Sequence, residues 1–283
     1  MYIFKTKENL INHLSKLRLK NLSTGFVPTM GALHLGHLSL IEFSKKNNDI
    51  SIASIFVNPT QFDNKKDLIN YPLTIDQDIE LLKQAECDIL FLPSVKEMYD
   101  ETVSAENFDF DGLEFEMEGR HRNGHFDGVG TIVKSFFEII QPTNAYFGEK
   151  DFQQLQIVKK LVEKKGIPVK VHGGYIYRER DGLAMSSRNM RLTKNQRLAA
   201  PFIYRTLQEA VALFKEKPVD YINQWVGRQF EKNELLTLEY FTIADVKTLK
   251  TITHKEEGKE YRAFIAVFAG NVRLIDNISL DRF

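Results

Sequence analysis

Apolar runs and helical patterns alternate in the first third of the chain, and this alternation constrains the fold most. Residues 26–27, 50–57 and 89–92 are apolar runs of the kind found in strands buried on both faces of a sheet. Between them, residues 38–43 and 75–86 place apolar side chains at helical spacing. This order predicts a parallel sheet with helices on both faces, an α/β fold. Ligands of such sheets bind beyond the carboxyl ends of the strands.

The same alternation continues to about residue 177. Helical spacing over 132–140 and 152–163 flanks a short apolar strand at 145–147. One or two last strands are expected at 169–171 and 175–177.

The pattern then changes, and we place a domain boundary there, with one domain at 1–176 and another at 177–283. The second domain begins with helical patterns at 193–214 and 219–231. Three strands joined by polar turns are expected after them, which predicts a small α+β domain. These strands are residues 236–241, 263–268 and 272–275.

Composition argues against several classes of protein. The formal net charge of the 283 residues is zero, which argues against nucleic acid as the main partner, since phosphate-backbone binding needs a basic face. The single cysteine, Cys87, cannot form an internal disulfide and fits a reducing compartment. No run approaches the length of a membrane span, and the first residues lack the apolar region of a signal peptide. We therefore expect a cytoplasmic protein that binds neither nucleic acid nor membrane.

Residues 28–38, P-T-M-G-A-L-H-L-G-H-L, lie where a strand meets a helix. A glycine-containing turn followed by a helix start favours anions, because unpaired backbone N–H groups and the helix dipole point at the turn. His34 and His37 are expected on one face of the first helical turn, where both can donate hydrogen bonds to nucleotide phosphates. Gly36 leaves no side chain between backbone and ligand. An ordinary polar turn is the alternative, and a zinc site lacks an obvious third ligand.

Polar side chains also follow two other expected strands. Asn58 and Gln61 come after the run at 50–57, and Gln154 follows the strand at 145–147. A side-chain amide both donates and accepts, which suits a substrate that carries hydroxyls and a carboxylate. The alternative for either glutamine is an exposed polar side chain.

Two charged segments are candidates for phosphate binding. Lys150 can neutralise phosphate charge, and Asp151 can accept from a ribose hydroxyl or from the water shell of a cation. The loop 178–191 is basic and rich in hydroxyls, and it could clamp a triphosphate and steady departing pyrophosphate. A solvated helix start and a charged linker are the respective alternatives. The acid-rich residues 97–118 are expected to form a solvated flap without the ligand spacing of a magnesium site.

Taken together, these segments resemble the pantothenate synthetase (pantoate–β-alanine ligase) family. That family lies within the superfamily of nucleotidylyl transferases and class I synthetases that carry an H-x-G-H motif. The resemblance covers essentially the whole chain. The matching segments are residues 28–38, 57–62 (V-N-P-x-Q-F), 122–129 (R-x-G-H-F-x-G-V), 147–154 (F-G-x-K-D-x-Q-Q), 181–189 (D-G-L-A-x-S-S-R-N) and 273–277 (R-L-I-D-N).

The resemblance implies a Rossmann-like domain at 1–176 that binds ATP and pantoate, a C-terminal lid domain at 177–283, and a homodimer. It also implies a reaction in two steps. The carboxylate of pantoate attacks the α-phosphorus of MgATP, which gives pantoyl-adenylate and pyrophosphate. The amine of β-alanine then displaces AMP and forms pantothenate, so that no covalent enzyme intermediate is needed.

The resemblance further assigns roles to individual residues. His37, His34, Lys150 and Arg188 would stabilise charge at the phosphates, with His37 as proton donor or charge stabiliser. Gln61 would bind pantoate and β-alanine, and Gln154 would bind pantoate. Asn58 would also belong to the substrate-binding residues. Arg122 and His125 would lie near the active site and the subunit contact. No protein ligand of Mg²⁺ is assigned. The residues expected to bind ATP are Met30, Gly31, Ala32, Leu33, His34, Leu35, Gly36, His37, Gly148, Glu149, Lys150, Asp151, Tyr177, Met185, Ser186, Ser187 and Arg188.

Three positions depart from the family pattern, namely Asn123, Asp63 and Leu73, where proline, glycine and arginine are usual. They put loop stiffness and dimer contacts in doubt, and leave the reaction intact.

Other functions remain alternatives. A nucleotidylyl transferase acting on a phosphorylated substrate would want extra basic residues, whereas Gln61 and Gln154 favour an uncharged polyol acid. An aminoacyl-tRNA synthetase would need a basic RNA-binding face. A non-catalytic nucleotide-binding protein would not need the intact set of His34, His37, Lys150 and Arg188.

Overall fold

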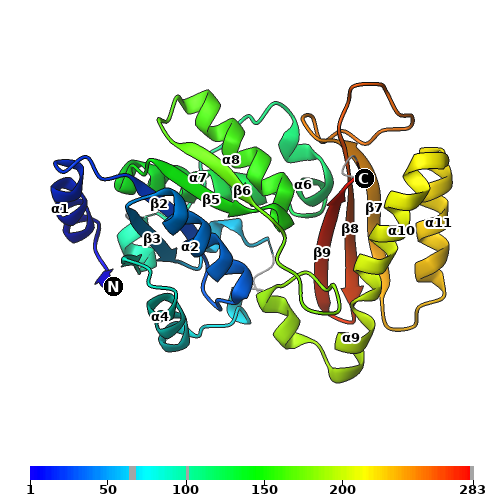
Figure 1. The fold of residues 1–283 in the computed structure, drawn as a ribbon, viewed down its shortest axis with the longest axis horizontal. Helices are drawn as coiled ribbons and strands as arrows, with labels where there is room; N and C mark the ends of the chain where they lie inside the picture. Colours follow the sequence, from blue (N-terminus) through cyan, green and yellow to red (C-terminus); the bar gives the residue numbers. More distant parts are fainter. Residues whose placement is uncertain (64–67, 100–101, 281–283) are drawn as a thin grey trace. The chain divides into compact units, whose positions relative to one another are not determined.

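The computed structural model describes residues 1–63, 68–99 and 102–280 (Figure 1). The chain divides into two compact units. The first consists of Met1–Glu149 and Gln153–Tyr175, and the second of Lys150–Phe152 and Ile176–Phe283. The short segment Lys150–Phe152 therefore belongs to the second unit, although the chain on both sides of it belongs to the first.

The first unit is built on a six-stranded sheet in the order β1-β4-β3-β2-β5-β6, with every strand pair parallel. The predicted parallel sheet is thus confirmed. Its strands are β1 (Tyr2–Phe4), β2 (Thr24–Thr29), β3 (Ile50–Ile55), β4 (Ile89–Phe91), β5 (Asn144–Gly148) and β6 (Lys170–Gly174).

Three details of the strands differ from the prediction. Strand β1 was not foreseen, because three residues are too few to show a period. Strand β2 continues through Pro28 to Thr29, so these two residues belong to the strand and not to the turn. Residues 175–177, where a further strand was expected, lie outside any strand.

Helices cover both faces of this sheet. Phe26 and Val27 point to opposite faces because successive strand side chains alternate. On one face Phe26 packs against Phe136, with ring centroids 5.5 Å apart. On the other, Val27 shares a buried cluster with Ile41 and Leu82. The helices are α1 (Lys7–Arg18), α2 (Leu35–Asn47), α4 (Ile75–Gln84), α5 (Val95–Met98), α6 (Met117–His121), α7 (His125–Ile140) and α8 (Phe152–Lys165).

The order of the strands fixes where a ligand can bind. From β2, the chain adds β3 and β4 on one side and later β5 and β6 on the other. The direction of winding therefore reverses between β2 and β5, and the crevice at the carboxyl ends of such strands is the usual ligand site of an α/β sheet. The turn that carries His34 and His37 follows β2 directly.

The acid-rich residues 97–118 are not simply a solvated flap. The short helix η2 (Leu113–Phe115) lies within this segment, and Phe110, Leu113 and Met117 are buried. Apolar side chains between the acids explain the difference, since their burial outweighs the solvation of the charged neighbours. Residues 100–101 of this acid-rich run lie outside the described residues.

The second unit is an α+β unit with a three-stranded antiparallel sheet, as predicted. Its strands, in the order β7-β8-β9, are β7 (Thr237–Asp245), β8 (Tyr261–Ala269) and β9 (Val272–Ser279). The helical pattern at 193–214 forms two helices, α9 (Lys194–Ala199) and α10 (Phe202–Glu216), because the chain breaks at Ala200-Pro201. With α11 (Val219–Glu231), they supply much of a core cluster that includes Leu207, Ile222 and Ile265.

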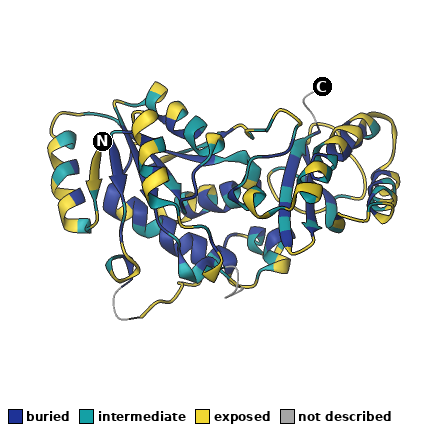
Figure 2. Ribbon diagram, turned by 90° about the horizontal axis from the view of Figure 1, so that it is seen from below, coloured by how far each residue is buried: buried dark blue, intermediate teal, exposed yellow. Residues whose placement is uncertain are grey.

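Figure 2 shows that the strands of both sheets are mostly buried and that the helices expose one side. None of the helices in the described part of the chain has the length and apolar character that crossing a membrane requires.

Candidate active site

The turn after β2 is held in place by a buried carboxylate. Asp78 of α4 accepts hydrogen bonds from the backbone N–H of Ala32 (2.9 Å) and of Leu33 (2.7 Å). Its side chain is only 1% exposed. Gly31 and Ala32 both have positive φ, at 84° and 49°. The expectation that the N–H groups of this turn are unpaired is therefore wrong for Ala32 and Leu33, because they are already bonded within the protein.

His34 and His37 form a mutual cap at the start of α2. The backbone N–H of His34 donates to Nδ1 of His37 (3.3 Å), and that of Gly36 donates to Nδ1 of His34 (3.2 Å). His34 has extended φ and ψ, so it precedes the helix. The expectation that His34 lies on the first helical turn is therefore wrong. The two rings stack with centroids 4.0 Å apart.

This cap decides which ring nitrogens carry hydrogen. A nitrogen that accepts a hydrogen bond is unprotonated, so the hydrogen of each neutral ring is on Nε2. The structure thus brings two imidazole Nε2–H donors together at the carboxyl end of β2, next to the point where the strand order reverses. Paired donors of this kind can stabilise negative charge that develops on phosphate oxygens.

Gln61 lies in the short helix η1 (Pro59–Gln61), after β3, with its amide held in one orientation. The Nδ2 group of Asn58 donates to Oε1 of Gln61 (3.2 Å) and to the carbonyl oxygen of Gly128 (3.0 Å). Because Oε1 of Gln61 accepts this bond, its Nε2 points the other way, where it lies 3.0 Å from Sδ of Met30. Gln61 therefore presents N–H donors beside Met30, another residue of the predicted site.

Asn58 acts through Gln61 in this arrangement. It is 1% exposed, and its Oδ1 accepts from the hydroxyl of Tyr99 at 2.5 Å. Burial raises the pKa of Tyr99, so that its hydroxyl stays protonated and able to donate. Direct contact of Asn58 with a substrate remains a prediction.

Arg122 and His125 hold the backbone of Gln61. Nδ1 of His125 lies 2.7 Å from the carbonyl oxygen of Gln61. A carbonyl only accepts, so Nδ1 is the donor, and Nε2 accepts from Nη1 of Arg122 across 3.1 Å. Nε of Arg122 lies 3.7 Å from Asp63, so the residue that replaces the usual glycine makes an ion pair here. The segment that carries Arg122 and His125, which was expected near the active site, thus holds Gln61 through its backbone carbonyl and leaves its side-chain amide to Asn58 and Met30.

Gln154 lies near the start of α8 and is half-buried. Its neighbour Gln153 is buried and uses its Nε2 to donate to the carbonyl oxygens of Leu113 and Glu116, both at 2.8 Å. Within the described residues, no hydrogen bond joins the amide of Gln154 to that of Gln61. The pairing of the two amides on one substrate therefore remains a prediction.

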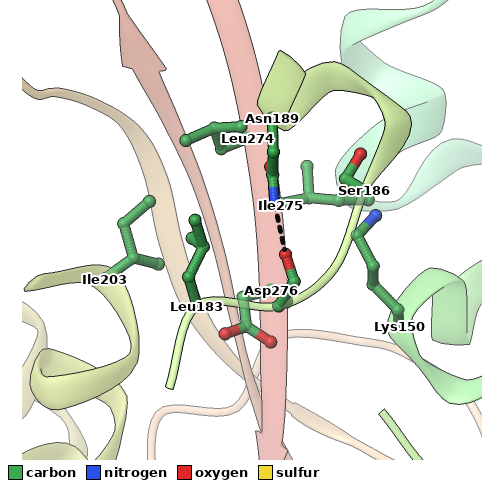
Figure 3. A pocket seen from close by; sticks show the side chains of 9 residues that line it. Lys150, Leu183, Ser186, Asn189, Ile203, Leu274, Ile275 and Asp276 are labelled. Atoms are coloured by element: carbon green, nitrogen blue, oxygen red, sulfur yellow. Dashed lines mark hydrogen bonds between the residues drawn. The ribbon is translucent and has the colours of Figure 1, made fainter. Parts of the chain in front are cut away.

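The second unit carries the other charged candidates. Lys150 and Ser186 line one small pocket together with Asn189 and Asp276 (Figure 3). Ser186 caps the short helix η4 (Ser187–Arg191) by accepting from the backbone N–H of Arg188 (3.3 Å). Asp151, in contrast, has a side chain that is 48% exposed.

The base of the loop 178–191 is closed by the backbone. The N–H of Met185 donates to the carbonyl oxygen of Tyr177 (3.0 Å), and Arg178 and Ala184 form an isolated β-bridge. This places the predicted residues Tyr177 and Met185 side by side.

Comparison of the sequence with known proteins identifies the family to which this site belongs. The family model of pantoate-beta-alanine ligase matches residues 2–279. The pantothenate synthetase of Christiangramia forsetii is 53% identical over 282 residues, which cover 99% of this chain and 100% of the relative.

The chain belongs to the pantoate–β-alanine ligase family.

Two solved structures agree with this membership. The crystal structure of pantothenate synthetase from Thermus thermophilus superposes with a TM-score of 0.91 at 37% identity and covers 99% of each chain. The pantoate-β-alanine ligase of Francisella tularensis, solved with β-γ ATP and β-alanine, gives a TM-score of 0.81 at 34% identity, covering 100% of this chain and 99% of that one. The α/β fold is thus the fold of the pantoate–β-alanine ligase family.

This member of the pantoate–β-alanine ligase family also uses residues that the sequence did not single out. Asp78 holds the turn after β2 from an ordinary amphipathic helix. Tyr99 acts on Gln61 by way of Asn58 and lies in the acid-rich stretch. Neither position carries a local sequence signal of its role. Asn277 donates to the backbone oxygen of Lys150 at 2.9 Å. Its motif, residues 273–277, was noticed as part of the resemblance without a role being assigned to it.

A protein-bound metal centre is not evident in the family member described here. Across residues 1–63, 68–99 and 102–280, no group of three or more His, Cys, Asp or Glu side chains could hold a metal ion.

Proposed function

We propose that this chain is a pantoate–β-alanine ligase that makes pantothenate by way of pantoyl-adenylate. The observation that carries the proposal is the His34–His37 cap, with its two Nε2–H donors at the carboxyl end of β2, in a chain of this family. The relative from Francisella tularensis was crystallised with β-γ ATP and β-alanine, which supports ATP and β-alanine as substrates here.

In the first step, an oxygen of the pantoate carboxylate forms a bond to the α-phosphorus of ATP, and the bond from that phosphorus to the pyrophosphate oxygen breaks. Negative charge grows on the phosphate oxygens, and the Nε2–H groups of His34 and His37 donate to them. Lys150 and Arg188 add positive charge at the phosphates. Magnesium would enter with ATP as part of the substrate and would neutralise part of the phosphate charge.

In the second step, the amine of β-alanine attacks the acyl carbon of pantoyl-adenylate and loses a proton, while AMP leaves with the bonding electrons. The protein contributes by holding the reactants in place and keeping water from the labile adenylate. Gln61 supports this role, because its Nε2–H₂ group donates to an oxygen of pantoate while Asn58 occupies its Oε1.

The alternative is a nucleotidylyl transferase that acts on a phosphorylated substrate. Such a substrate needs cationic partners near Gln61. Among the described residues, Arg122 is a cation that contacts this region, and it is directed at the carbonyl oxygen of Gln61, at His125 and at the carboxylates of Asp63 and Glu118. This pairing favours a polyol acid that carries no phosphate group.

The test is exchange of labelled pyrophosphate into ATP with magnesium and without β-alanine. Exchange that requires pantoate supports the adenylate, and formation of AMP and pantothenate after β-alanine is added completes the reaction. ATP binding without pantoate-dependent exchange would overturn the assignment and favour the transferase.

The two histidines can be tested without disturbing the helix start. In His34→Asn, at the N-cap of α2, asparagine can still accept a backbone N–H, and it is among the best cap residues. In His37→Asn, at the third helical position, the side-chain oxygen can still accept the backbone N–H of residue 34. We expect exchange to fall about 100-fold or more, the usual cost of removing a preorganised donor from developing charge. Unchanged exchange in both variants would show that the cap is structural only.

The homodimer, the cytoplasmic location, the magnesium requirement and the lid role of residues 177–283 belong to the same proposal. Each rests on the resemblance and the composition. Size-exclusion chromatography with light scattering tests the dimer, and exchange in the presence of a chelator tests the metal requirement.

A further inference from the structure

Asp276 and Asn277 are adjacent residues of β9 that face opposite sides of the three-stranded sheet. They are only 4% and 2% exposed. Successive side chains of a strand alternate between faces. Asp276 thus shares a face with Leu274, which belongs to the helix-covered core, whereas Asn277 pairs across the sheet with Phe264 on the other face. Two buried polar side chains in succession call for partners on both sides of the strand.

On the first face, Asp276 binds the arginine at the base of the 178–191 loop. Nη1 and Nη2 of Arg178 donate to the two carboxylate oxygens, at 2.6 and 2.9 Å. The same guanidinium donates to the carbonyl oxygen of Gly182 (3.1 Å) and lies 3.7 Å from the ring centroid of Tyr204. Burial raises the pKa of Asp276, and Arg178 opposes that shift. A bidentate pair held at so many points fixes an orientation as well as a distance.

On the second face, Asn277 binds the segment Lys150–Phe152. Its Nδ2 donates to the carbonyl oxygen of Lys150 at 2.9 Å, and its Oδ1 accepts from Arg262. The guanidinium of Arg262 lies 4.1 Å from the ring centroid of Phe152, which also contacts the ring of Phe264. Donor, acceptor and ring stacking together explain why this segment belongs to the second unit.

The two segments that β9 holds meet at the same pocket. Lys150 and Ser186 line it, and Asp276 lies at its wall (Figure 3). The amide of Asn189 stiffens the loop there, since its Nδ2 donates to Glu179 and to the carbonyl oxygen of Ala184.

We propose that Asp276 and Asn277 are positioning residues that hold Lys150 and the Ser186–Arg188 loop in one fixed arrangement for the phosphates of ATP. The inference rests on the proposed function, in which both segments bind these phosphates. Neither Asp276 nor Asn277 needs to touch the nucleotide. Each acts by fixing the backbone from which a phosphate-binding side chain projects.

The decisive variant is Asn277→Asp. It keeps an oxygen facing Arg262, but it removes the N–H donor to Lys150 and sets a carboxylate oxygen against the carbonyl oxygen of Lys150. A displacement of this kind near reacting groups costs about 10- to 100-fold in rate. We expect kcat/KM for ATP to fall by that factor, while KM for pantoate, whose binding is assigned to Gln61 and Gln154, changes less than about 2-fold.

A matched control is Glu239→Gln on β7. Glu239 pairs with Arg273 of β9 at 2.8 Å, so it belongs to the same sheet as Asn277 and contacts the strand that carries Asn277. Glu239→Gln therefore measures how a weakened sheet by itself changes the kinetics. We expect its kinetic constants for ATP and pantoate to stay near those of the parent chain.

A double-mutant cycle separates positioning from general damage. If Asn277 acts through Lys150, Asn277→Asp costs little more once Lys150→Ala is present, because residues that share one interaction are not additive. Additive losses, or an unchanged kcat/KM for ATP in Asn277→Asp, would overturn the inference. Should Asn277→Asp not fold, Asp276→Asn in a cycle with Arg188→Ala answers the same question on the other face.

Pyrophosphate exchange by the parent chain tells a failure of the proposed function from a failure of the positioning role. If it shows no pantoate-dependent pyrophosphate exchange, the proposed function fails. If it exchanges and the cycle is additive, only the positioning role fails.

Discussion

Nδ1 of His125 donates to the carbonyl oxygen of Gln61 across 2.7 Å, which ties the start of α7 to the residue proposed to bind pantoate. His125 is 6% exposed, so water cannot replace the bond when it is lost. The other donor to this oxygen, Nη2 of Arg122, lies 3.5 Å away and makes only a long hydrogen bond. A buried carbonyl that loses its short hydrogen bond is poorly satisfied, which costs about 1–3 kcal/mol.

We therefore expect His125→Ala to lower the free energy of unfolding by about 1–3 kcal/mol. KM for pantoate should rise by about 10-fold, the effect of a bound group misplaced by a fraction of an ångström. Urea unfolding and steady-state kinetics measure the two effects. His125→Asn, whose side-chain N–H can reach the same oxygen, should recover part of both.

His254→Ala is the matched histidine control, since the side chain of His254 is 76% exposed. It should leave stability and kinetics unchanged. If His125→Ala behaves like this control, the hydrogen bond has no role in holding Gln61.

The hydroxyl of Tyr99 is the second support of the pantoate amide. It donates to Oδ1 of Asn58 at 2.5 Å, and Asn58 in turn donates to Oε1 of Gln61. In Tyr99→Phe, the orientation of Asn58 is less well determined, so Gln61 can turn its oxygen toward the substrate. We expect KM for pantoate to rise several-fold, with a stability loss of about 1 kcal/mol for the missing hydrogen bond.

Tyr146→Phe is a matched control in the same unit. Its hydroxyl accepts from Asn48 at 2.8 Å, and the ring is 1% exposed, so the same atom is removed from a buried tyrosine that has no role at Gln61. Stability should fall about as much as in Tyr99→Phe, with pantoate kinetics unchanged. Equal pantoate kinetics in the two variants would contradict the role of Tyr99.

The sequence predicts the sheet well because β2 and β3 are buried on both faces, which leaves short runs rich in apolar residues at 26–27 and 50–57. It also predicts that the two histidines lie where a strand turns into a helix, since a glycine turn between strand and helix is a local signal. The details that it misses are set by distant residues. Asp78 is 46 positions from Ala32, and Tyr99 is 41 positions from Asn58.

The membership of Lys150 in the second unit shows the same limit. The sequence places this residue between a strand and a helix of the first unit, as the structure does. Its backbone partner, Asn277, lies 127 positions further along the chain. No period or local motif encodes a contact over that separation, so only the three-dimensional structure can reveal it.

Cys87 should resist thiol reagents in the folded protein. It is 2% exposed, and burial raises its pKa to about 11, so the reactive thiolate is scarce at neutral pH. We expect slow labelling by iodoacetamide at pH 8 and fast labelling in urea, both measurable by mass spectrometry. Equal rates in the two conditions would contradict the burial.

The raised pKa of Cys87 also gives stability a pH dependence. The folded chain holds this proton more tightly than the unfolded chain, so the contribution is fully present below the unfolded pKa of the thiol. It is lost as pH rises through the folded pKa of about 11. The free energy of unfolding should fall less steeply between pH 8.5 and 11, roughly the two thiol pKa values, in Cys87→Ala than in the parent chain.

Asp78 provides the sharpest test of how the nucleotide turn is built. Its carboxylate accepts from two backbone N–H groups and from the hydroxyl of Thr74 at 3.1 Å. In Asp78→Asn, an NH₂ group faces at least one backbone N–H, and a buried donor loses its acceptor. We expect a stability loss of about 2–3 kcal/mol and weaker ATP binding, because the turn before His34 loses its anchor.

Asp76→Asn is the matched control. It removes the same charge from the same helical turn at an exposed position, so it corrects for the helix dipole. Calorimetric titration with ATP and urea unfolding of both variants decide the matter, and equal effects at the two positions would mean that the turn holds itself.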